Sequence, residues 1–375
     1  MQALILVGGE GTRLRPLTST VPKPVVPLVD RPLISYMLEW IKRHGVDDVI
    51  MSCGFLAAGV RNVLGDGSEF GMRLRFVEEP EPLGTAGALK FAESMLDERF
   101  LMLNGDVLTD IDLTAQLAQH ELTSAKATLA LVAVPDPTNY GLVRLEEDGA
   151  VREFVEKPSM DAVEERPATD DPGDNMISAG AYVLERTILE HVPAGKNVSI
   201  EREIWPLLVG NGLYGFRADT YWLDIGTPER YLRATFDIIE GNVETAVRER
   251  LGEGYLAVSE EAEVEGRAIP PAVLERGVHV AADAHVGSLV VLGQDVCVGA
   301  GSTVERSVIL NGTEIGEHCR LSDCIVAAGC RIGPGTRISG GAVLGEGVTV
   351  GAENVIANGA RIFPGVDLPD GALQF

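Results

Sequence analysis

Aliphatic residues recur at every sixth position in the C-terminal third of the chain. One run with this period extends from Leu274 to Leu310 and a second from Ile332 to Leu368, with an irregular stretch through Ile315 and Leu321 between them. A spacing of six fits neither the two-residue period of a strand nor the 3.6-residue period of a helix. It is typical of a parallel β-helix, in which each repeat forms one flat side of a coil. We therefore expect a left-handed parallel β-helix of hexapeptide repeats over residues 256–375.

The first 241 residues follow a different pattern, in which short apolar runs alternate with amphipathic stretches. The runs are rich in leucine and β-branched residues, as strands are, and several of the stretches between them end at glycine, as helices often do. This order predicts a Rossmann-like, doubly wound, largely parallel mixed sheet with ligands at the carboxyl ends of its strands. The polar residues 242–255 are expected to form a linker. The expected strands are residues 3–7, 48–53, 73–77, 100–103, 128–134, 142–146, 151–155 and 177–184, and the expected helices are residues 32–44, 57–64, 85–94, 113–123, 200–209 and 228–240.

A glycine turn follows the first expected strand and leads into a short basic segment. Gly8, Gly9 and Gly11 precede Arg13, and Lys23 stands between two prolines. A turn with little side-chain bulk lets backbone N–H groups approach an anion, and the two cations add positive charge at fixed places. The segment is therefore expected to hold a polyphosphate, with Arg13 shielded from solvent.

Two common phosphate-binding loops are excluded by the sequence. The dinucleotide-binding loop requires a third glycine, but the glycine pair at 9 and 11 is followed by Leu14 where that glycine should be. The P-loop string G-x-x-x-x-G-K-[ST] does not occur anywhere in the chain. Three glycines alone are also compatible with an ordinary turn at a strand end, so the whole stretch of residues 8–27 carries the inference.

Residues 8–27 closely resemble the opening motif of the sugar-1-phosphate nucleotidyltransferases, and later motifs recur in that family's order over essentially the whole chain. The resemblance implies a nucleotidyltransferase-type sheet and a Mg²⁺-dependent transfer of a nucleotidyl group to a sugar 1-phosphate. It also implies that Arg13 and Lys23 are catalytic residues that hold the triphosphate. The nucleotide-binding residues that the resemblance assigns are Leu6, Gly8, Gly9, Gly11, Thr12, Arg13, Glu79, Gly84, Thr85 and Gly105.

Two aspartates match the family's metal-binding and catalytic positions. Asp106 follows an expected strand, and Asp224 lies in the string from Trp222 to Thr227. Mg²⁺ prefers oxygen ligands and commonly takes one or two carboxylates together with phosphate oxygens. The resemblance implies that both aspartates hold the metal, although each could instead cap a turn.

The string from Phe154 to Pro158 resembles the family's sugar-phosphate motif. The resemblance implies that Glu156 hydrogen-bonds sugar hydroxyls and that Lys157 contacts the phosphate, whereas the bare string could also be a solvated strand end. Ser178 stands where the family usually has asparagine, which leaves the sugar contact at this position open. The sugar-phosphate-binding residues that the resemblance assigns are Tyr140, Gly141, Glu156, Lys157, Asn175 and Gly180, of which Asn175 could equally be a turn residue.

The stretch from Glu79 to Ala88 matches the family's base-binding loop, in which Gly84 and Gly87 would admit a flat base beside the backbone. Thymidylyl- and uridylyl-transferring relatives commonly have glutamine at the position aligned with Glu79. Guanine presents two adjacent N–H donors that one ionised carboxylate can accept together, so glutamate at this position favours guanine. The alignment could slip onto Glu81, and Glu79 could also be an ordinary solvated residue.

The composition limits the partners of the protein. A net charge of −25 argues against binding to nucleic acid or to an anionic membrane surface. The five cysteines form no C-x-x-C pair and are expected to be reduced and packed, and no apolar run suggests export or a membrane span. We expect a cytoplasmic protein.

Within the family, the chain most resembles the members that transfer a guanylyl group from GTP to mannose 1-phosphate, giving GDP-mannose and pyrophosphate. Two alternatives stay open: a glucose-1-phosphate thymidylyl- or uridylyltransferase, and a non-catalytic regulatory subunit. An acyltransferase would need a placed histidine base, but His279, His285 and His318 are expected to be surface or repeat-turn residues. The β-helix is therefore expected to be structural and to assemble a homo-oligomer.

Overall fold

The computed structural model describes residues 1–54, 57–159 and 176–374, and the chain divides into two compact units. The first unit comprises Met1–Gly9 and Met37–Trp222, and the second comprises Glu10–Tyr36 and Leu223–Phe375. The second unit thus combines a short segment near the N-terminus with the whole C-terminal part of the chain.

The first unit is built on a mixed sheet that has nine strands among the described residues. The strands are β1 (Gln2–Leu6), β4 (Asp48–Cys53), β5 (Arg73–Glu78), β6 (Arg99–Asn104), β8 (Ala127–Ala133), β9 (Gly141–Leu145), β10 (Val151–Glu156), β11 (Met176–Glu185) and β12 (Leu213–Arg217). Strands β6, β1, β4 and β5 are parallel neighbours in that order, and β11 pairs antiparallel with β6, β8 and β9. The expected mixed, doubly wound sheet is confirmed.

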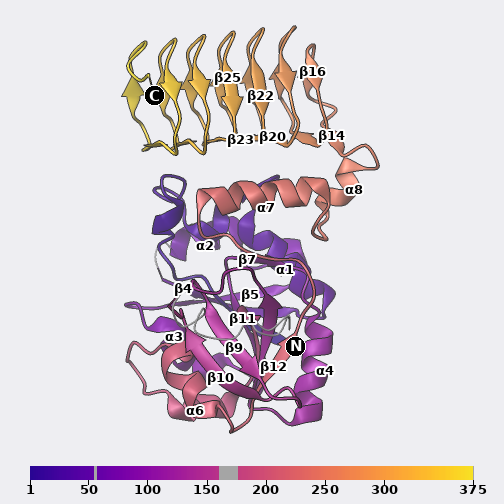
Figure 1. Ribbon diagram of the computed structural model, residues 1–375, viewed down its shortest axis with the longest axis vertical. Helices are drawn as coiled ribbons and strands as arrows, with labels where there is room; N and C mark the ends of the chain where they lie inside the picture. The colour runs from indigo at the N-terminus through magenta and orange to yellow at the C-terminus, as the bar shows by residue number, and fades with distance from the viewer. Residues whose placement is uncertain (55–56, 160–175, 375) are drawn as a thin grey trace. The chain divides into compact units, whose positions relative to one another are not determined.

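Helices α3 and α4 are seen on opposite sides of this sheet (Figure 1). The helices in this part of the chain are α1 (Leu33–Arg43), α2 (Ala57–Leu64), α3 (Gly84–Ala92), α4 (Leu113–Thr123) and α6 (Trp205–Leu208). The helix expected over residues 200–209 is instead a π-helical turn, Ile200–Ile204, followed by the short α6. The regular hydrogen-bond pattern fails here because Pro206 has no N–H to donate.

The second unit begins with a hairpin and continues after Leu223 with two helices. Its first elements are β2 (Pro27–Leu28), β3 (Arg31–Pro32), α7 (Pro228–Glu240) and α8 (Val247–Leu251), and the chain also has the short strands β7 (Val107–Thr109) and β13 (Trp222–Asp224). Helix α7 matches its expected bounds, between the Thr227 side chain as N-cap and Gly241 with a positive φ of 77°. The segment expected to be a polar connection contains α8, whose Val247 and Leu251 are buried.

Twenty short strands in residues 256–368 form three parallel sheets that wind as a β-helix. The coils stack in sequence from β14 to the C-terminus (Figure 1), which confirms the expected architecture. One sheet contains β14 (Leu256–Val258), β17 (Ala272–Leu274), β20 (Val290–Leu292), β23 (Ser307–Ile309), β26 (Ile325–Val326), β29 (Val343–Leu344) and β32 (Arg361–Ile362). The second contains β15 (Glu263–Val264), β18 (His279–Val280), β21 (Cys297–Val298), β24 (Glu314–Ile315), β27 (Arg331–Ile332), β30 (Thr349–Val350) and β33 (Asp367–Leu368), and the third contains β16 (Arg267–Ala268), β19 (His285–Val286), β22 (Thr303–Glu305), β25 (Arg320–Ser322), β28 (Arg337–Ile338) and β31 (Val355–Ile356).

The register of the coils corrects one position of the six-residue pattern. Leu292 pairs with Ile309, not with Leu310, so the inward position moves by one residue. The step is short because the single residue Arg306, with φ of 46°, forms the corner between β22 and β23. A similar short corner at Asp323 (φ 48°) moves the inward position by one more residue, from Ile309 to Val326, so the two six-residue runs differ in phase by two residues and the irregular stretch is a coil with tighter corners.

Adjacent coils are joined by buried hydroxyl groups at their corners. The Ser302 hydroxyl donates to Gly316 O at 2.7 Å and accepts from Cys319 N at 2.9 Å, and Thr336 bridges Gly351 O and Asn354 N in the same way. Each such group pairs with one backbone donor and one backbone acceptor of neighbouring corners, and so helps to satisfy polar groups that are buried there.

Four of the five cysteines are buried as expected, but Cys297 is exposed. Cys297 precedes the inward-facing Val298 on β21, and alternation along a strand turns it outward. Burial raises the pKa of Cys324 to about 12, so this thiol stays protonated. Within the described part of the chain, no helix is both long enough and apolar enough to cross a bilayer.

Candidate active site

Two strand ends of the first unit meet where the glycine turn begins. Gly105 N donates to Leu6 O at 3.0 Å, so the ends of β1 and β6 lie side by side. A Cβ at Gly105 would lie 2.7 Å from Leu6 O, and one at Gly54 would lie 2.8 Å from Gly8 O. These close approaches require glycine. Gly9, by contrast, is exposed and has no atom within 4 Å of its Cβ position, so space beside it is open to a ligand.

The rest of the glycine turn lies in the second unit. Gly11 has a φ of 62°, and a Cβ there would lie 3.1 Å from both Lys23 Cβ and Thr18 Cγ2. The Thr18 hydroxyl donates to Gly11 O at 2.7 Å, and Thr12 is exposed at the start of a single 3₁₀ turn, Thr12–Leu14. The turn and the half-buried Lys23 are therefore packed directly against each other.

Arg13 and Asp224 lie together on either side of Gly226. A Cβ at Gly226 would be 3.0 Å from Arg13 Nη2 and 3.0 Å from Asp224 Oδ1, so any larger residue would crowd both groups. Arg230, in the first turn of α7, donates to Asp224 Oδ2 at 2.5 Å. The expectation that Arg13 is shielded is wrong: its side chain is exposed, because the 3₁₀ turn buries Leu14 instead.

Asp106 lies in the first unit, half-buried in the turn between β6 and β7. Among the residues that the structure describes, no group of three or more acidic, histidine or cysteine side chains is close enough to chelate a metal. A metal held here would therefore use one or two carboxylates and complete its shell with phosphate oxygens, which is common for Mg²⁺. Sharing of one ion by Asp106 and Asp224 stays a prediction.

The Glu79 carboxylate is fixed beside the glycine turn. Its Oε1 accepts from the buried Ser52 hydroxyl at 2.9 Å, its Oε2 accepts from Leu83 N at 3.1 Å, and Oε1 lies 3.6 Å from the Cβ position of Gly8. Each carboxylate oxygen can accept a second hydrogen bond, so both retain capacity for a ligand. Glu81 is exposed. The geometry therefore favours Glu79 over Glu81 as the base-reading residue.

The glycines after Glu79 are approached closely by another part of the chain, and their place beside a base stays a prediction. A Cβ at Gly84 would lie 2.7 Å from Val198 O, and one at Gly87 would lie 2.5 Å from Lys196 O. On this side the chain's own residues 196–198 approach the backbone, where the sequence suggested a base. Thr85 Oγ1 donates to Glu201 Oε2 at 2.8 Å and accepts from Ile200 N, which ties α3 to the π-helical turn.

The expected sugar-phosphate residues gather around β9 and β10. A Cβ at Gly141 would lie 3.2 Å from Glu156 Oε2, and Lys157 N donates to Tyr140 O at 2.9 Å. The Tyr140 ring packs edge-on against Trp222, with ring centres 5.3 Å apart. Four of the six assigned residues therefore lie in one neighbourhood.

The electrostatic environment of Glu156 differs from that of a solvated strand end. Burial raises the pKa of Glu156, and the negative charge of Glu201 raises it further, while Lys157 and Arg202 act in the opposite direction. Lys157 Nζ lies 3.9 Å from Glu156 Oε1, and its side chain is largely exposed. A half-buried carboxylate beside an exposed ammonium suits a ligand that has both hydroxyl groups and a phosphate.

Gly180 occupies a bulge of β11, where the register shifts between Ser178 and Tyr182. Its φ is 77°, and a Cβ there would lie 2.8 Å from Asn104 Nδ2, so the bulge lets β11 approach the end of β6. The Ser178 hydroxyl pairs with the Tyr182 hydroxyl at 2.9 Å. Asn175, also assigned to the sugar, lies outside the described residues.

Sequence reasoning missed the partners that hold these groups in place. Ser52 anchors Glu79, Glu201 perturbs Glu156, Arg230 pairs with Asp224, and Trp222 donates to Ala179 O at 2.8 Å. Of these four partners, only Trp222 is indicated by the sequence, because it is the first residue of the string from Trp222 to Thr227.

Two family models match the chain. The model described as nucleotidyl transferase matches residues 2–241, and the model described as GMPPB C-terminal domain matches residues 268–370.

Full-length relatives and a solved structure agree with these matches. The chain is 35% identical to "Mannose-1-phosphate guanylyltransferase" of Mycobacterium tuberculosis, over 100% of this chain and 98% of the relative. It is 33% identical to "Mannose-1-phosphate guanylyltransferase catalytic subunit beta" of Danio rerio, over 99% and 98% of the two chains. The crystal structure of HddC from Yersinia pseudotuberculosis complexed with GMP-PN superposes with a TM-score of 0.53 at 27% identity, over 63% of this chain and 99% of HddC.

Proposed function

We propose that this chain, which belongs to the nucleotidyl transferase family, transfers a guanylyl group from GTP to mannose 1-phosphate and so forms GDP-mannose and pyrophosphate. The observation that carries the proposal is the likeness to mannose-1-phosphate guanylyltransferases along the whole chain, including the β-helix. The site geometry supports each part of the reaction separately.

The fixed Glu79 carboxylate supports guanine as the base. Ser52 and Leu83 N hold its two oxygens in place, and each oxygen can still accept one N–H from a base edge. Guanine offers two such donors side by side, whereas a pyrimidine imide edge offers one donor between two acceptors, which a carboxylate would repel.

The exposed Arg13 and the half-buried Lys23 are the groups that we propose hold the triphosphate. A sugar-phosphate oxygen is already anionic, so its attack on the α-phosphorus needs no general base; the chain must align the anions and offset their repulsion. The planar guanidinium of Arg13 suits two phosphate oxygens and the ammonium of Lys23 suits one. As pyrophosphate leaves, the same two groups stabilise the charge that it carries away.

The two aspartates fit a divalent cation by the chemistry of their donors. Asp224 is only 15% exposed and already holds a cationic group, the guanidinium of Arg230, against its carboxylate. We propose that Asp106 and Asp224 hold Mg²⁺, which when bound offsets phosphate charge. Glu156 and Lys157 would bind the sugar hydroxyls and the sugar phosphate, with Tyr140, Gly141 and Gly180 shaping that pocket.

We further propose that residues 1–241 are the catalytic domain, 242–255 the linker and 256–375 an assembly domain, in a cytoplasmic homo-oligomer. The nucleotidyl transferase match over residues 2–241 supports the first boundary. The last strands of two of the three sheets, β32 and β33, have no further strand beside them among the described residues, and Phe363 near that end is 51% exposed, which supports association through the β-helix. Light scattering on the purified chain would show a single protomer mass if this is wrong.

A substrate matrix tests the activity. Initial rates of pyrophosphate release, measured for four nucleoside triphosphates against several sugar 1-phosphates, should be highest for GTP with mannose 1-phosphate. A preference for dTTP or UTP would indicate the thymidylyl or uridylyl alternative, and no release with any pair would indicate a regulatory subunit. Lys23→Ala and Asp224→Asn should each reduce kcat/KM at least about a hundredfold without lowering the melting temperature by more than a few degrees.

A further inference from the structure

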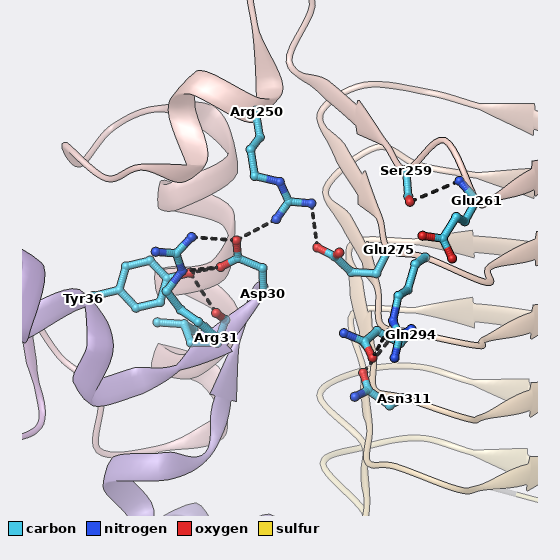
Figure 2. A network of polar contacts seen from close by, with 11 residues as sticks. Asp30, Arg31, Tyr36, Arg250, Ser259, Glu261, Glu275, Gln294 and Asn311 are labelled. Atoms are coloured by element: carbon cyan, nitrogen blue, oxygen red, sulfur yellow. Dashed lines mark hydrogen bonds and ion pairs between the residues drawn. The ribbon is translucent and has the colours of Figure 1, made fainter. Parts of the chain in front are cut away.

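The carboxylate of Asp30 is almost completely buried at the turn between β2 and β3. It is 7% exposed and accepts four hydrogen bonds (Figure 2). Arg31 donates to both of its oxygens, at 2.8 and 2.9 Å, and Arg250 Nη1 donates to Oδ2 at 2.6 Å. The Tyr36 hydroxyl shares its one proton between Oδ1, at 3.0 Å, and Leu28 O, at 2.8 Å. So complete a set of donors fixes the position of this turn.

Arg250 joins that turn to the β-helix. It extends from α8, and its second terminal nitrogen, Nη2, donates to Glu275 Oε1 at 2.8 Å (Figure 2). Glu275 directly follows β17 in the β-helix and is 16% exposed. Asp30 and Glu275 balance the charges of Arg31 and Arg250, so removing one member leaves a poorly hydrated charge without its partner.

The turn that this network holds is strained. Val29 has a φ of 56°, a conformation that β-branched residues almost never adopt and that persists only where surrounding contacts impose it. The hairpin is also held by α7, because the Tyr231 hydroxyl donates to Pro27 O at 2.5 Å.

The hairpin follows directly on the segment that carries the phosphate-binding cation. Lys23 begins the 3₁₀ turn Lys23–Val25, and only Val26 separates that turn from β2. Leu33 N donates to Val26 O at 2.9 Å and closes the hairpin onto the same segment. A displacement of the hairpin would therefore be transmitted to Lys23 through three residues of continuous backbone.

We propose that Arg250 is a positioning residue for the triphosphate-binding segment, and that the β-helix is the body against which this segment is fixed. The inference rests on the proposed function, in which Lys23 holds the triphosphate. The sugar-phosphate residues Glu156 and Lys157 belong to the other unit. The proposal therefore predicts an effect on the nucleotide and not on the sugar phosphate.

The experiment compares full-length Arg250→Ala with a matched control, Arg331→Ala. Arg331 lies in the β-helix and, like Arg250, faces an acidic residue, but its contact with Glu314 is 3.9 Å and both side chains are more than half exposed. We expect Arg250→Ala to raise KM for GTP about tenfold and to weaken GTP binding by calorimetry to the same extent, while KM for mannose 1-phosphate changes less than twofold. Arg331→Ala should match the wild type, and Arg250→Lys should recover part of the loss.

Two results would overturn the proposal. One is a change of less than twofold in both KM values, and the other is a parallel rise in both, which would indicate general destabilisation. If Arg250→Ala does not fold, Glu275→Gln, which keeps the pair between Asp30 and Arg250, should give a smaller shift in the same direction. Failure of the proposed function is distinguishable, because the wild type would then release no pyrophosphate from GTP and mannose 1-phosphate.

Discussion

Replacement of Arg230 by glutamine should strengthen the binding of a divalent cation in the absence of nucleotide. Arg230 Nη1 lies 2.5 Å from Asp224 Oδ2, so a guanidinium already occupies one oxygen of the carboxylate that we assign to the metal. A metal ion that approaches Asp224 meets both competition for this oxygen and repulsion from the positive charge. Glutamine removes the charge and keeps most of the side-chain length.

The magnitude follows from the exposure of the pair. Two unit charges about 4 Å apart interact by about 1 kcal/mol in water and about 4 kcal/mol at an effective dielectric constant of 20. The side chains of Asp224 and Arg230 are 15% and 31% exposed, so the site lies between these limits, and solvent screening places it in the lower half. We expect a gain of about 1–2 kcal/mol, which is roughly a 5- to 30-fold lower dissociation constant.

Electron paramagnetic resonance of free Mn²⁺ measures this dissociation constant directly, with Mn²⁺ in place of Mg²⁺. Arg233→Gln is the matched control, because Arg233 lies on the same helix, pairs with Asp237 at 2.8 Å and is 67% exposed. It should bind Mn²⁺ like the wild type, and Arg230→Lys should change little because the charge is kept. Equal Mn²⁺ affinity of Arg230→Gln and the wild type would refute the reasoning, and unchanged Mn²⁺ binding by Asp224→Asn with GTP present would refute the metal assignment itself.

Three further changes test the base site and the stability of each unit. Glu79→Gln should lower kcat/KM with GTP about tenfold or more relative to UTP, by initial rates, because one acceptor is lost, while the exposed Glu81→Gln should leave this ratio unchanged. Burial lowers the pKa of His120, which is hydrogen-bonded to Glu185, so the unfolded chain binds a proton that the folded chain does not; the free energy of unfolding, measured with urea, should fall by up to about 1.4 kcal/mol per pH unit as the pH drops below about 6.5, and His120→Gln should flatten this dependence. Thr336→Val should destabilise the β-helix by about 1–3 kcal/mol, measured by calorimetry, because the buried backbone donor Asn354 N loses its acceptor and Gly351 O loses one of its two donors; an unchanged melting temperature would contradict the role of the buried hydroxyls.

The sequence predicts the fold well wherever one periodic signal dominates. The six-residue period defines the β-helix, but it cannot place the inward residue within Val308-Ile309-Leu310, since all three are aliphatic. The phase there is decided by the tight corner at Arg306, a backbone feature that an arginine in a six-residue pattern does not reveal. The helix expected over residues 200–209 failed for a similar reason, because Pro206 altered the hydrogen bonding within an otherwise apolar and charged stretch.

The candidate site could be predicted only as far as local strings reach. Glu79 lies within a motif, but Ser52, which fixes its side chain, is 27 residues earlier in the chain. Likewise Thr85 lies within the motif, but Glu201, to which it donates a hydrogen bond, is 116 residues after Thr85. Such polar partners produce no periodic pattern in the sequence, because a hydrogen bond requires a particular residue at one position and places no requirement on the residues beside it. Gly84 and Gly87 show that one sequence feature can have two explanations. Glycine at these positions could make room for a bound base, but it also makes room for residues 196–198 of the chain itself.

The division of site residues between the two units suggests a role for the β-helix in the proposed reaction. Arg13, Lys23 and Asp224 belong to the same unit as the β-helix, and Glu156 and Lys157 belong to the unit with the sheet, so the two cations proposed to bind the triphosphate are supported within the second unit. A β-helix suits this task, because each coil pairs with its neighbours along three sheets and its buried corner groups are hydrogen-bonded. Arg250 connects the strained hairpin turn to this β-helix, because it donates hydrogen bonds to both Asp30 and Glu275. Cations held in this way lose little freedom when a triphosphate binds, and such preorganisation is where much of the rate enhancement of a reaction between two anions arises.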